Sequence, residues 1–215
     1  MNTVKSFFTL LFFVGFSVCF TACKKDDPAP VTLTGNTIKD LAADPPSGGY
    51  NPTNGQPIGV TGKYTLFSFK TGAVVANTDS ATTKWDIGFN GTKIIVNSGT
   101  SGPGSAAALV QTGLFDQITT APDAGYTQDN KSAAPAFYAI ARGSGKGWYN
   151  YDRATNLISA KAGVVLIFKT ADGKYAKMEI QNYYKGAPAA PTSTIADRYY
   201  TFRYLYQGDG STKLQ

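Results

Sequence analysis

A β-hairpin signal near the C-terminal end constrains the fold of this chain more than any other stretch. Residues 164–168 are an unbroken run of β-branched, aliphatic and aromatic residues, and residues 175–184 form a second, alternating run. Between the two runs lie Asp172 and Gly173, a pair that favours the φ > 0 positions of a type I′ turn. The first run predicts a strand inside a sheet, because it is apolar on both faces, whereas the second predicts a strand with one face toward water. We therefore expect an antiparallel sheet built beside this hairpin.

Further strands are predicted by β-branched or alternating stretches between Gly- and Pro-rich segments. The predicted strands are residues 31–38, 61–70, 73–75, 84–97 with a break at Gly91, 137–141 and 198–207. Residues 106–118 fit either a short helix or an irregular strand that breaks at Gly113. The predicted loops are residues 44–59, 98–105, 121–136 and 185–194. The predicted fold class is mostly β, a single domain of antiparallel sheets with long loops forming a cleft.

The N-terminus has the features of a lipoprotein signal. Residues 7–20 are apolar, too short a run for a typical membrane span, and they lead to a Phe-Thr-Ala-Cys sequence that resembles a bacterial lipobox ending at Cys23. We predict a lipoprotein signal peptide over residues 1–22, lipidation of Cys23, a tether over residues 23–30 and a β domain over residues 31–215. An ordinary cleaved signal that leaves a free Cys23 is the alternative.

The four residues after Cys23 are Lys-Lys-Asp-Asp, which resembles the export tag of Bacteroidetes surface lipoproteins. This resemblance implies an outer-membrane protein anchored by its lipid at the cell surface. A solvated tether without an export role is the alternative reading of the same four residues.

Several classes of function are excluded by residues that the chain lacks. It contains no histidine, which removes Ser-His-Asp and Cys-His catalysis and the commonest metal ligand. Its two cysteines lie in the signal peptide and at the lipidation site, so the mature chain has no disulfide or thiol nucleophile. Acidic residues are dispersed, with no glycosidase-like pair, and the +6 formal charge is scattered without an RNA-binding pattern. We expect neither an enzyme nor a nucleic-acid-binding protein.

Three side chains are candidates for ligand binding, namely Tyr126, Tyr138 and Met178. Tyr126 and Tyr138 lie in or beside predicted loops, and a phenol can stack, donate a hydrogen bond or ligate iron. Met178 is the one methionine of the mature chain and offers a thioether, although its alternation with Ile180 also fits core packing. For Asp86 a structural role is predicted. The glycine-rich residues 98–105 lack the Gly-Lys-Ser/Thr ending of a phosphate loop and are interpreted as a strand connection.

The chain resembles the HmuY family of lipid-anchored haem-binding proteins of Bacteroidetes. The resemblance covers about residues 64–210 and is carried by the motif KWDIGFN at residues 84–90 and by residues 95–97, 148–152, 170–178, 183–185 and 201–204. It implies an all-β antiparallel fold with a cleft, and capture of haem for an outer-membrane uptake receptor. Histidines or methionines ligate the iron in the family, and no histidine is available here to take that role.

The resemblance makes haem or a related porphyrin the expected ligand, bound without histidine ligands and without catalysis, and haem the one expected cofactor. The membrane, through the lipid anchor, and an outer-membrane receptor are the expected partners. No metal-ligand set can be assigned from the sequence. The alternative function is a surface lipoprotein that binds a glycan or another ligand, or that is an accessory to an outer-membrane transporter.

Overall fold

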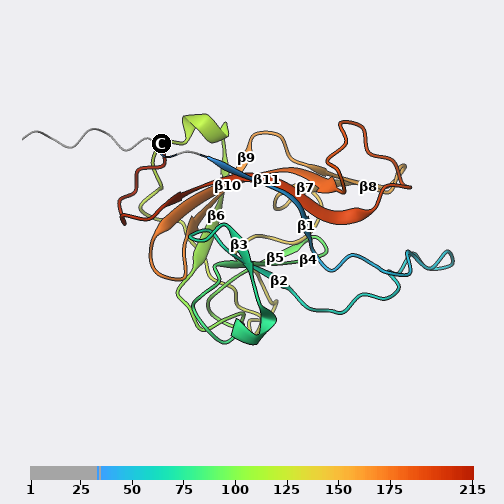
Figure 1. The fold of residues 1–215 in the computed structure, drawn as a ribbon, viewed down its shortest axis with the longest axis horizontal. Coiled ribbons are helices and arrows are strands. Elements are labelled where there is room, and N and C mark those ends of the chain that lie inside the picture. Colours follow the sequence, from blue (N-terminus) through green and yellow to red (C-terminus); the bar gives the residue numbers. More distant parts are fainter. Residues whose placement is uncertain (1–32, 34) are drawn as a thin grey trace, which may run out of the picture. The chain divides into compact units, whose positions relative to one another are not determined.

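The computed structural model describes residue 33 and residues 35–215, which belong to one compact unit that begins at residue 32. Its larger sheet has five antiparallel strands in the order β1-β11-β10-β9-β6 (Figure 1). These strands are β1 (Asn36–Ala42), β6 (Ala107–Thr112), β9 (Val164–Lys169), β10 (Tyr175–Tyr184) and β11 (Asp197–Gln207). The predicted antiparallel, mostly β architecture is confirmed.

A second sheet has four strands in the order β3-β2-β4-β5, and a third is the two-stranded pair β7-β8. Their bounds are β2 (Thr65–Ser68), β3 (Ala73–Val75), β4 (Ile87–Asn90), β5 (Lys93–Val96), β7 (Tyr149–Asp152) and β8 (Leu157–Ala160). Two single turns of 3-10 helix, η1 (Asn77–Asp79) and η2 (Phe115–Gln117), complete the regular structure. No helix among the described residues has the length and apolar character needed to cross a membrane.

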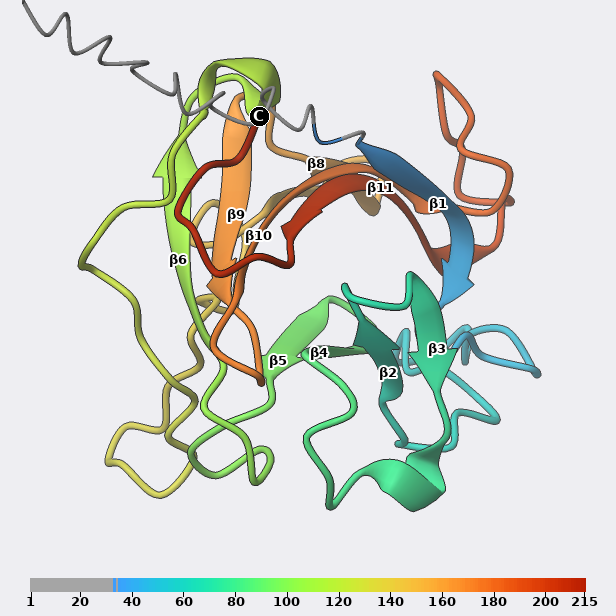
Figure 2. The same ribbon diagram turned by 60° about the vertical axis from the view of Figure 1, so that its left-hand side comes forward.

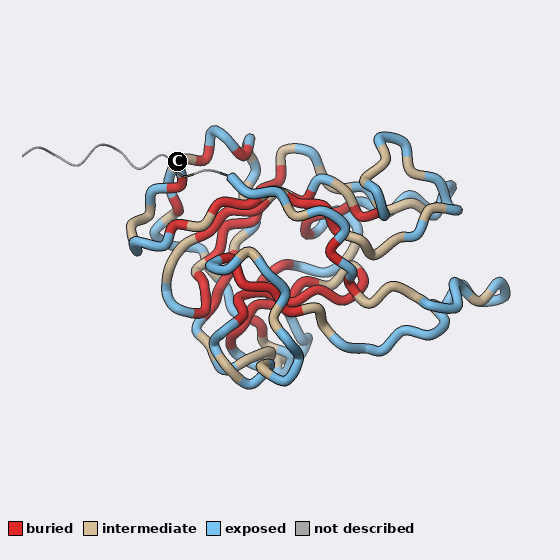
Figure 3. Tube along the Cα trace, viewed as in Figure 1, coloured by how far each residue is buried: buried red, intermediate tan, exposed pale blue. Residues whose placement is uncertain are grey.

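The core lies between the five-stranded and the four-stranded sheet (Figures 2 and 3). Aromatic side chains from both sheets fill it. Phe67 of β2 meets Phe202 of β11 edge to face with the ring centroids 5.5 Å apart, and Phe89 of β4 stacks on the same ring at 5.7 Å. Aromatic pairs in such geometries add to the stabilisation from burial alone. These aromatic side chains therefore join the two sheets.

The predicted hairpin is present, but its turn differs from the prediction. Strands β9 and β10 pair in register from Lys169 with Tyr175, which leaves a five-residue loop instead of two residues. Gly173 has a positive φ of 77°, whereas Asp172 has no positive φ, so the type I′ turn was wrong. The Thr170 hydroxyl explains the longer loop, because it accepts a hydrogen bond from the Lys174 N–H and donates one to the Asp172 carboxylate.

The positions of the two hairpin strands in the sheet follow the sequence pattern only in part. Strand β9 lies between β10 and β6 and is buried on both faces, as predicted. On β10 the face that carries Tyr175, Lys177 and Glu179 is covered more than expected, and Lys177 is only 2% exposed. The cover comes from η2 and from Leu214, which pack on the outer face of the sheet. Covering by a sequence-distant segment is invisible to a strand's own periodicity.

Several other predicted elements are confirmed with changed bounds. Residues 73–75 pair back on β2 as predicted, and residues 84–97 form the hairpin β4-β5 around Gly91, whose φ is 54°. Residues 106–118 resolve into strand β6 followed by η2 after Gly113. The first strand begins at Asn36 and continues to Ala42, four residues beyond the predicted end, while residues 31, 32 and 34 lie outside the described part.

The predicted strand at residues 137–141 was wrong. Only Phe137 takes part in a bridge, an isolated antiparallel contact with Asn130. Two residues later, the Ala139 N–H donates to the carboxylate of Asp129 at 2.8 Å instead of to a neighbouring strand. A side chain thus takes the place of the strand partner, and residues 137–141 belong to the loop before β7.

Candidate functional site

An open groove of about 460 Å³ lies between β1, an edge strand of the five-stranded sheet, and the β2-β3 hairpin at the edge of the four-stranded sheet. We call it the edge groove, and its lining residues are Ile38, Lys39, Asp40, Leu41, Ala42, Thr65, Phe67, Gly72 and Val74. Strand β1 ends the five-stranded sheet on this side, and β3 ends the four-stranded sheet. Grooves of roughly 300–1,000 Å³ with mainly apolar walls are typical of small-molecule sites. The edge groove has this size and character.

The wall of the edge groove combines core residues with an exposed rim. Phe67 and Leu41 belong to the buried core, with 1% and 6% exposure, whereas Val74 on the other wall is 59% exposed. Gly72, with φ 64°, lies so close to Tyr204 that a Cβ there would be 2.6 Å from the tyrosine hydroxyl. A larger residue at position 72 would therefore displace Tyr204 or narrow the groove. An apolar ligand that enters the groove would rest on the core.

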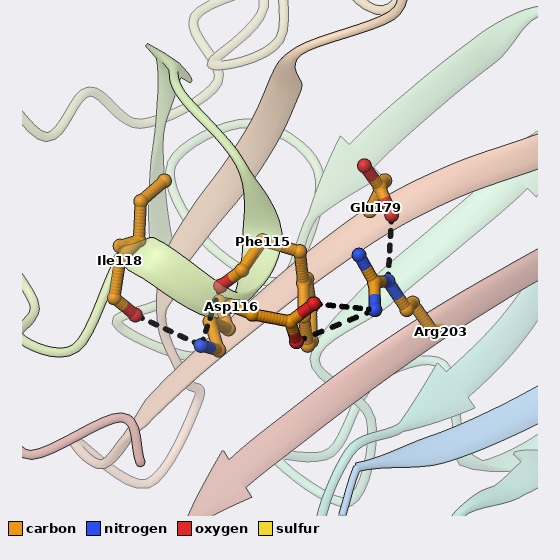
Figure 4. A network of polar contacts seen from close by, with 6 residues as sticks. Phe115, Asp116, Ile118, Glu179 and Arg203 are labelled. Carbon is orange, nitrogen blue, oxygen red and sulfur yellow. Dashed lines mark hydrogen bonds and ion pairs between the residues drawn. The ribbon is translucent and has the colours of Figure 1, made fainter.

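A second pocket, of about 450 Å³, lies on the outer face of the five-stranded sheet beneath η2. Its lining residues are Leu33, Gly35, Thr37, Phe115, Asp116, Lys177, Arg203, Leu205, Leu214 and Gln215. The Lys177 ammonium donates to the carbonyls of Phe115 at 2.7 Å and Ile118 at 2.8 Å (Figure 4). These bonds fasten η2 to the sheet.

The polar groups of the second pocket satisfy one another. Arg203 donates to Glu179 at 2.6 Å and to Asp116 at 3.1 Å (Figure 4). Burial lowers the pKa of Lys177, Asp116 opposes this effect, and the positive charge of Arg203 adds to it. Since the charges of this pocket already serve internal contacts, the edge groove is the better candidate for an incoming ligand.

Tyr126, the first of the predicted ligand-binding residues, packs beside the hairpin. Its ring lies 6.4 Å from the ring of Tyr175, and the Lys169 ammonium is 4.9 Å from its centroid. The phenol oxygen is buried and makes no hydrogen bond to any described residue. Burial raises the pKa of Tyr126, and electrostatic repulsion from Tyr175 and from the Asp123 carboxylate raises it further. Forming a phenolate here is therefore unfavourable.

Tyr138 lies elsewhere, on the outer face of the four-stranded sheet. It packs against the cluster of Leu66, Trp85 and Ile95, and the guanidinium of Arg142 is 5.3 Å from its ring centroid. Its partly covered position makes it accessible to a ligand from the solvent side.

Met178 is fully buried in the core between the two large sheets, opposite Leu166 on β9 and Tyr204 on β11. Tyr126, Tyr138 and Met178 thus belong to three different packing clusters, and the structure does not bring them together. None of the three lines either pocket described above. Their roles in ligand binding stay predictions, as does lipidation of Cys23, which lies outside the described residues.

Asp86 joins the two large sheets from between them. Its carboxylate accepts a hydrogen bond from the Phe69 N–H at 2.8 Å and one from the Ala171 N–H at 2.9 Å. Burial raises the pKa of Asp86 to about 6; these two N–H groups oppose the shift, and the charge of Asp172 adds to it. The predicted structural role of Asp86 is confirmed, although one of its partners is 85 residues away in the chain.

Asp129 is a second buried carboxylate that, like Asp86, accepts hydrogen bonds from two backbone N–H groups. Asp129 is 1% exposed and accepts hydrogen bonds from the N–H groups of Val96 and Ala139, at 3.0 and 2.8 Å. It fixes the loop that carries Tyr138 to the end of β5. Burial raises the pKa of Asp129, while its hydrogen bonds oppose the shift.

The turn between β4 and β5 is held by two aromatic side chains. The Tyr200 hydroxyl donates to the Gly91 carbonyl at 2.8 Å, and the Trp148 indole N–H donates to the Thr92 carbonyl at 3.1 Å. Both rings are buried and lie 5.1 Å apart. The sequence motifs around residues 84–97, 148–152 and 198–204 therefore meet at this point and maintain the scaffold.

Neither pocket could be found from the sequence. The edge groove forms because β1 and the β2-β3 hairpin lie next to each other in space. No local sequence pattern encodes that contact. Lys177 gave a misleading signal, because lysine on an alternating strand usually faces water. Tyr64 and Lys93 were not singled out either, although both border the same sheet face as Tyr138.

The fold defines an all-β protein of two packed antiparallel sheets with an apolar groove at their shared edge. The family model described as HmuY protein matches residues 61–204, more than half of the chain, and the chain belongs to the HmuY family. The predicted resemblance to this family, placed at about residues 64–210, is thereby confirmed over residues 64–204. Proteins of this family are generally non-enzymatic and bind haem. None of the curated proteins compared with the chain matches it.

Solved structures to which the chain is similar come from Tannerella, Bacteroides and Porphyromonas. The Tannerella forsythia HmuY analogue in its apo form is 15% identical, with a TM-score of 0.48 over 82% of this chain and 96% of that chain. A Bacteroides vulgatus protein described as HmuY-like and haem-binding is 16% identical, with a TM-score of 0.47 over 80% of this chain and 91% of that chain. Apo PinO from Porphyromonas is 13% identical, with a TM-score of 0.47 over 82% of this chain and 98% of that chain.

Proposed function

We propose that this chain is a lipid-anchored protein of the outer-membrane surface that captures haem or a related porphyrin for uptake and has no catalytic activity. Membership of the HmuY family is the observation that carries the proposal. The composition agrees with it, because a chain without histidine and with dispersed carboxylates lacks the usual catalytic groups.

The edge groove is the proposed place of binding. Its exposed apolar wall is the side chain of Val74, above the core residues Phe67 and Leu41, which suits the face of a tetrapyrrole. Lys39 also lines the groove, and its ammonium offers a partner for a carboxylate of the ligand. Burial of apolar surface would supply most of the affinity, at roughly 25 cal/mol per Å².

The described residues do not offer a preformed pair of iron ligands. The sequence has no histidine, the Met178 sulfur is enclosed in the core, and deprotonation of Tyr126 is disfavoured by burial. Tyr126 and Tyr138 keep their proposed role as contacts for a ligand, but in separate places. We therefore propose that recognition depends on the porphyrin ring and its carboxylates and not on ligation of the iron.

The proposal includes the path of the ligand and the anchor. Cleavage after residue 22 and lipidation of Cys23 would anchor the protein, residues 23–30 would act as a tether, and residues 31–215 would form the binding domain. The partner would be an outer-membrane receptor that accepts the porphyrin. A flexible tether over residues 23–30 would allow the domain to reach a neighbouring receptor in the same membrane.

Titration of the purified full chain with haemin, in detergent, tests this function. We expect saturable binding and a shifted Soret band under oxidising and reducing conditions. A spectrum identical to that of free haemin at every ratio, together with unsaturable binding, would overturn the proposal.

A further inference from the structure

Two aromatic rings and two cations form a continuous surface on the outer face of the four-stranded sheet. We call it the aromatic–cation surface, and its residues are Tyr64, Lys93, Tyr138 and Arg142. The Lys93 ammonium lies 5.6 Å from the centroid of the Tyr64 ring, and the Arg142 guanidinium lies 5.3 Å from that of Tyr138. Two cation–π pairs thus lie side by side on one sheet.

The sheet itself dictates this arrangement. Tyr64 immediately precedes β2, Lys93 begins β5, and Gly88 of β4 lies between these two strands. A Cβ at Gly88 would be within 3.1 Å of Leu66 and Ile95, so the absence of a side chain lets these two close over the sheet. Tyr64 and Tyr138 pack on the resulting apolar layer and keep part of their surface in contact with solvent.

Within the part of the chain that the structure describes, the two cations of this surface form no ion pair. Neither Lys93 nor Arg142 takes part in the ion pairs found among residues 35–215. The carboxylates nearby serve other groups: Asp44 accepts hydrogen bonds from Thr61, Gly62 and Asn90, and Asp129 holds backbone N–H groups.

The electrostatic interactions of Lys93 also indicate that positive charge on this surface is not fully compensated. Burial lowers the pKa of Lys93, and the positive charges of Arg142 and Arg198 lower it further, while Asp44 opposes them. The charge of Arg142 also reaches Tyr64. An arriving anion would relieve this repulsion between cations, and the neighbouring rings would offer it an apolar face.

We infer that the aromatic–cation surface binds an acidic polysaccharide, through sugar rings packed on Tyr64 and Tyr138 and through carboxylate or sulfate groups paired with Lys93 and Arg142. A sugar chain fits this surface, because it binds along an open face without a deep cavity, whereas a ligand that needs burial on both sides would find none here. Carboxylated and sulfated sugars share the required oxyanion, so either could be the natural ligand. This inference does not depend on haem binding, which the previous subsection assigns to the edge groove.

Affinity electrophoresis of the full chain in detergent through gels that contain dextran sulfate, polygalacturonate or unmodified dextran tests the inference. We expect retardation by at least one of the two acidic polymers and none by dextran. Retardation by dextran sulfate alone, or by polygalacturonate alone, would support the site and identify the oxyanion. No retardation by either polymer would overturn the inference.

Three variants separate a built site from general attraction to a basic protein. The double variant Lys93→Gln and Arg142→Gln should raise the dissociation constant about tenfold. Tyr138→Leu should raise it about fivefold without a change in charge, because the sugar loses an aromatic face. Lys70→Gln, the control, removes an exposed lysine outside the surface and should change it by less than about twofold.

The outcomes that contradict the inference are equally specific. An effect of Lys70→Gln as large as that of the double variant, or an unchanged affinity in Tyr138→Leu, would show that only net charge matters. Because Arg142 is exposed, Arg142→Gln alone provides a folded variant if the double substitution disturbs β5. Haemin titration of the double variant Lys93→Gln and Arg142→Gln should remain unchanged, so failure of one function is distinguishable from failure of the other.

Discussion

The carboxylate of Asp86 accepts a hydrogen bond from the backbone N–H of Ala171 at 2.9 Å, across 85 residues of sequence. Ala171 lies in the loop of the β9-β10 hairpin, and the second oxygen of Asp86 accepts from Phe69 at the end of β2. One buried side chain therefore connects a strand of the four-stranded sheet with the turn of the five-stranded sheet.

Replacement of Asp86 by Ala should strongly destabilise the protein. Two buried N–H groups would lose their acceptor, and each such loss costs about 1–3 kcal/mol. We expect the free energy of unfolding at pH 7, measured in urea, to fall by about 2–4 kcal/mol. Asp79→Ala is the matched control, because it breaks the exposed ion pair with Lys84 and should cost less than about 1 kcal/mol. Equal losses in the two variants would contradict this role of Asp86.

The titration of Asp86 should make stability depend on pH in an unusual direction. Its pKa is raised by burial to about 6 in the folded protein, above the ordinary value of 3.8. The folded state therefore holds this proton more tightly. The stabilisation is fully present below the unfolded pKa of 3.8 and is lost as the pH rises through about 6. We expect the free energy of unfolding to fall by about 2 kcal/mol from pH 4 to pH 7 relative to Asp86→Asn. A constant difference between the two proteins would refute the shift.

Lys177 should hold η2 on the sheet. In Lys177→Met the side chain keeps its approximate length but no longer donates to the carbonyls of Phe115 and Ile118. We expect a loss of about 1–3 kcal/mol in stability and faster amide hydrogen exchange confined to residues near η2. Lys146→Met, at an exposed position, should leave both quantities unchanged. If the amide hydrogens near η2 exchange at the same rate in Lys177→Met and in Lys146→Met, Lys177 does not fasten this segment.

The edge groove makes a direct prediction for Val74. This residue is 59% exposed on β3, so Val74→Arg should place a long charged side chain across the groove at little cost in stability. We expect the dissociation constant for haemin to rise more than about tenfold, which corresponds to 1.4 kcal/mol of binding free energy. Val110→Arg on β6, which is the edge of the five-stranded sheet farthest from β1 and the groove, is the control and should bind as the unaltered chain does. If the two variants bind haemin equally well, the ligand lies elsewhere.

Sequence reasoning recovered the strands because their signals are local. Residues 164–168 and 175–184 carry their own periodicity, and the structure contains both strands. It failed at residues 137–141. There the Ala139 N–H donates to the carboxylate of Asp129, ten residues earlier in the chain, and not to a neighbouring strand. It also failed at the hairpin turn, where the Thr170 hydroxyl changes the loop length.

The candidate site was harder to predict than the fold. Tyr126, Tyr138 and Met178 were chosen for their chemistry, yet their distribution over three packing clusters depends on contacts between distant segments. The edge groove and the aromatic–cation surface each arise where strands from different parts of the chain meet. Tyr64 and Lys93, for instance, are separated by 29 positions but form a cation–π pair.

A comparison of haemin with iron-free protoporphyrin IX tests the central claim that this histidine-free chain recognises the porphyrin and not the iron. Both ligands are titrated into the full chain in detergent, with quenching of tryptophan fluorescence as the common signal. The account predicts saturable binding of both, with dissociation constants within about tenfold of each other, since iron ligation contributes little. Binding of haemin alone, with protoporphyrin IX weaker by more than about a hundredfold, would contradict it.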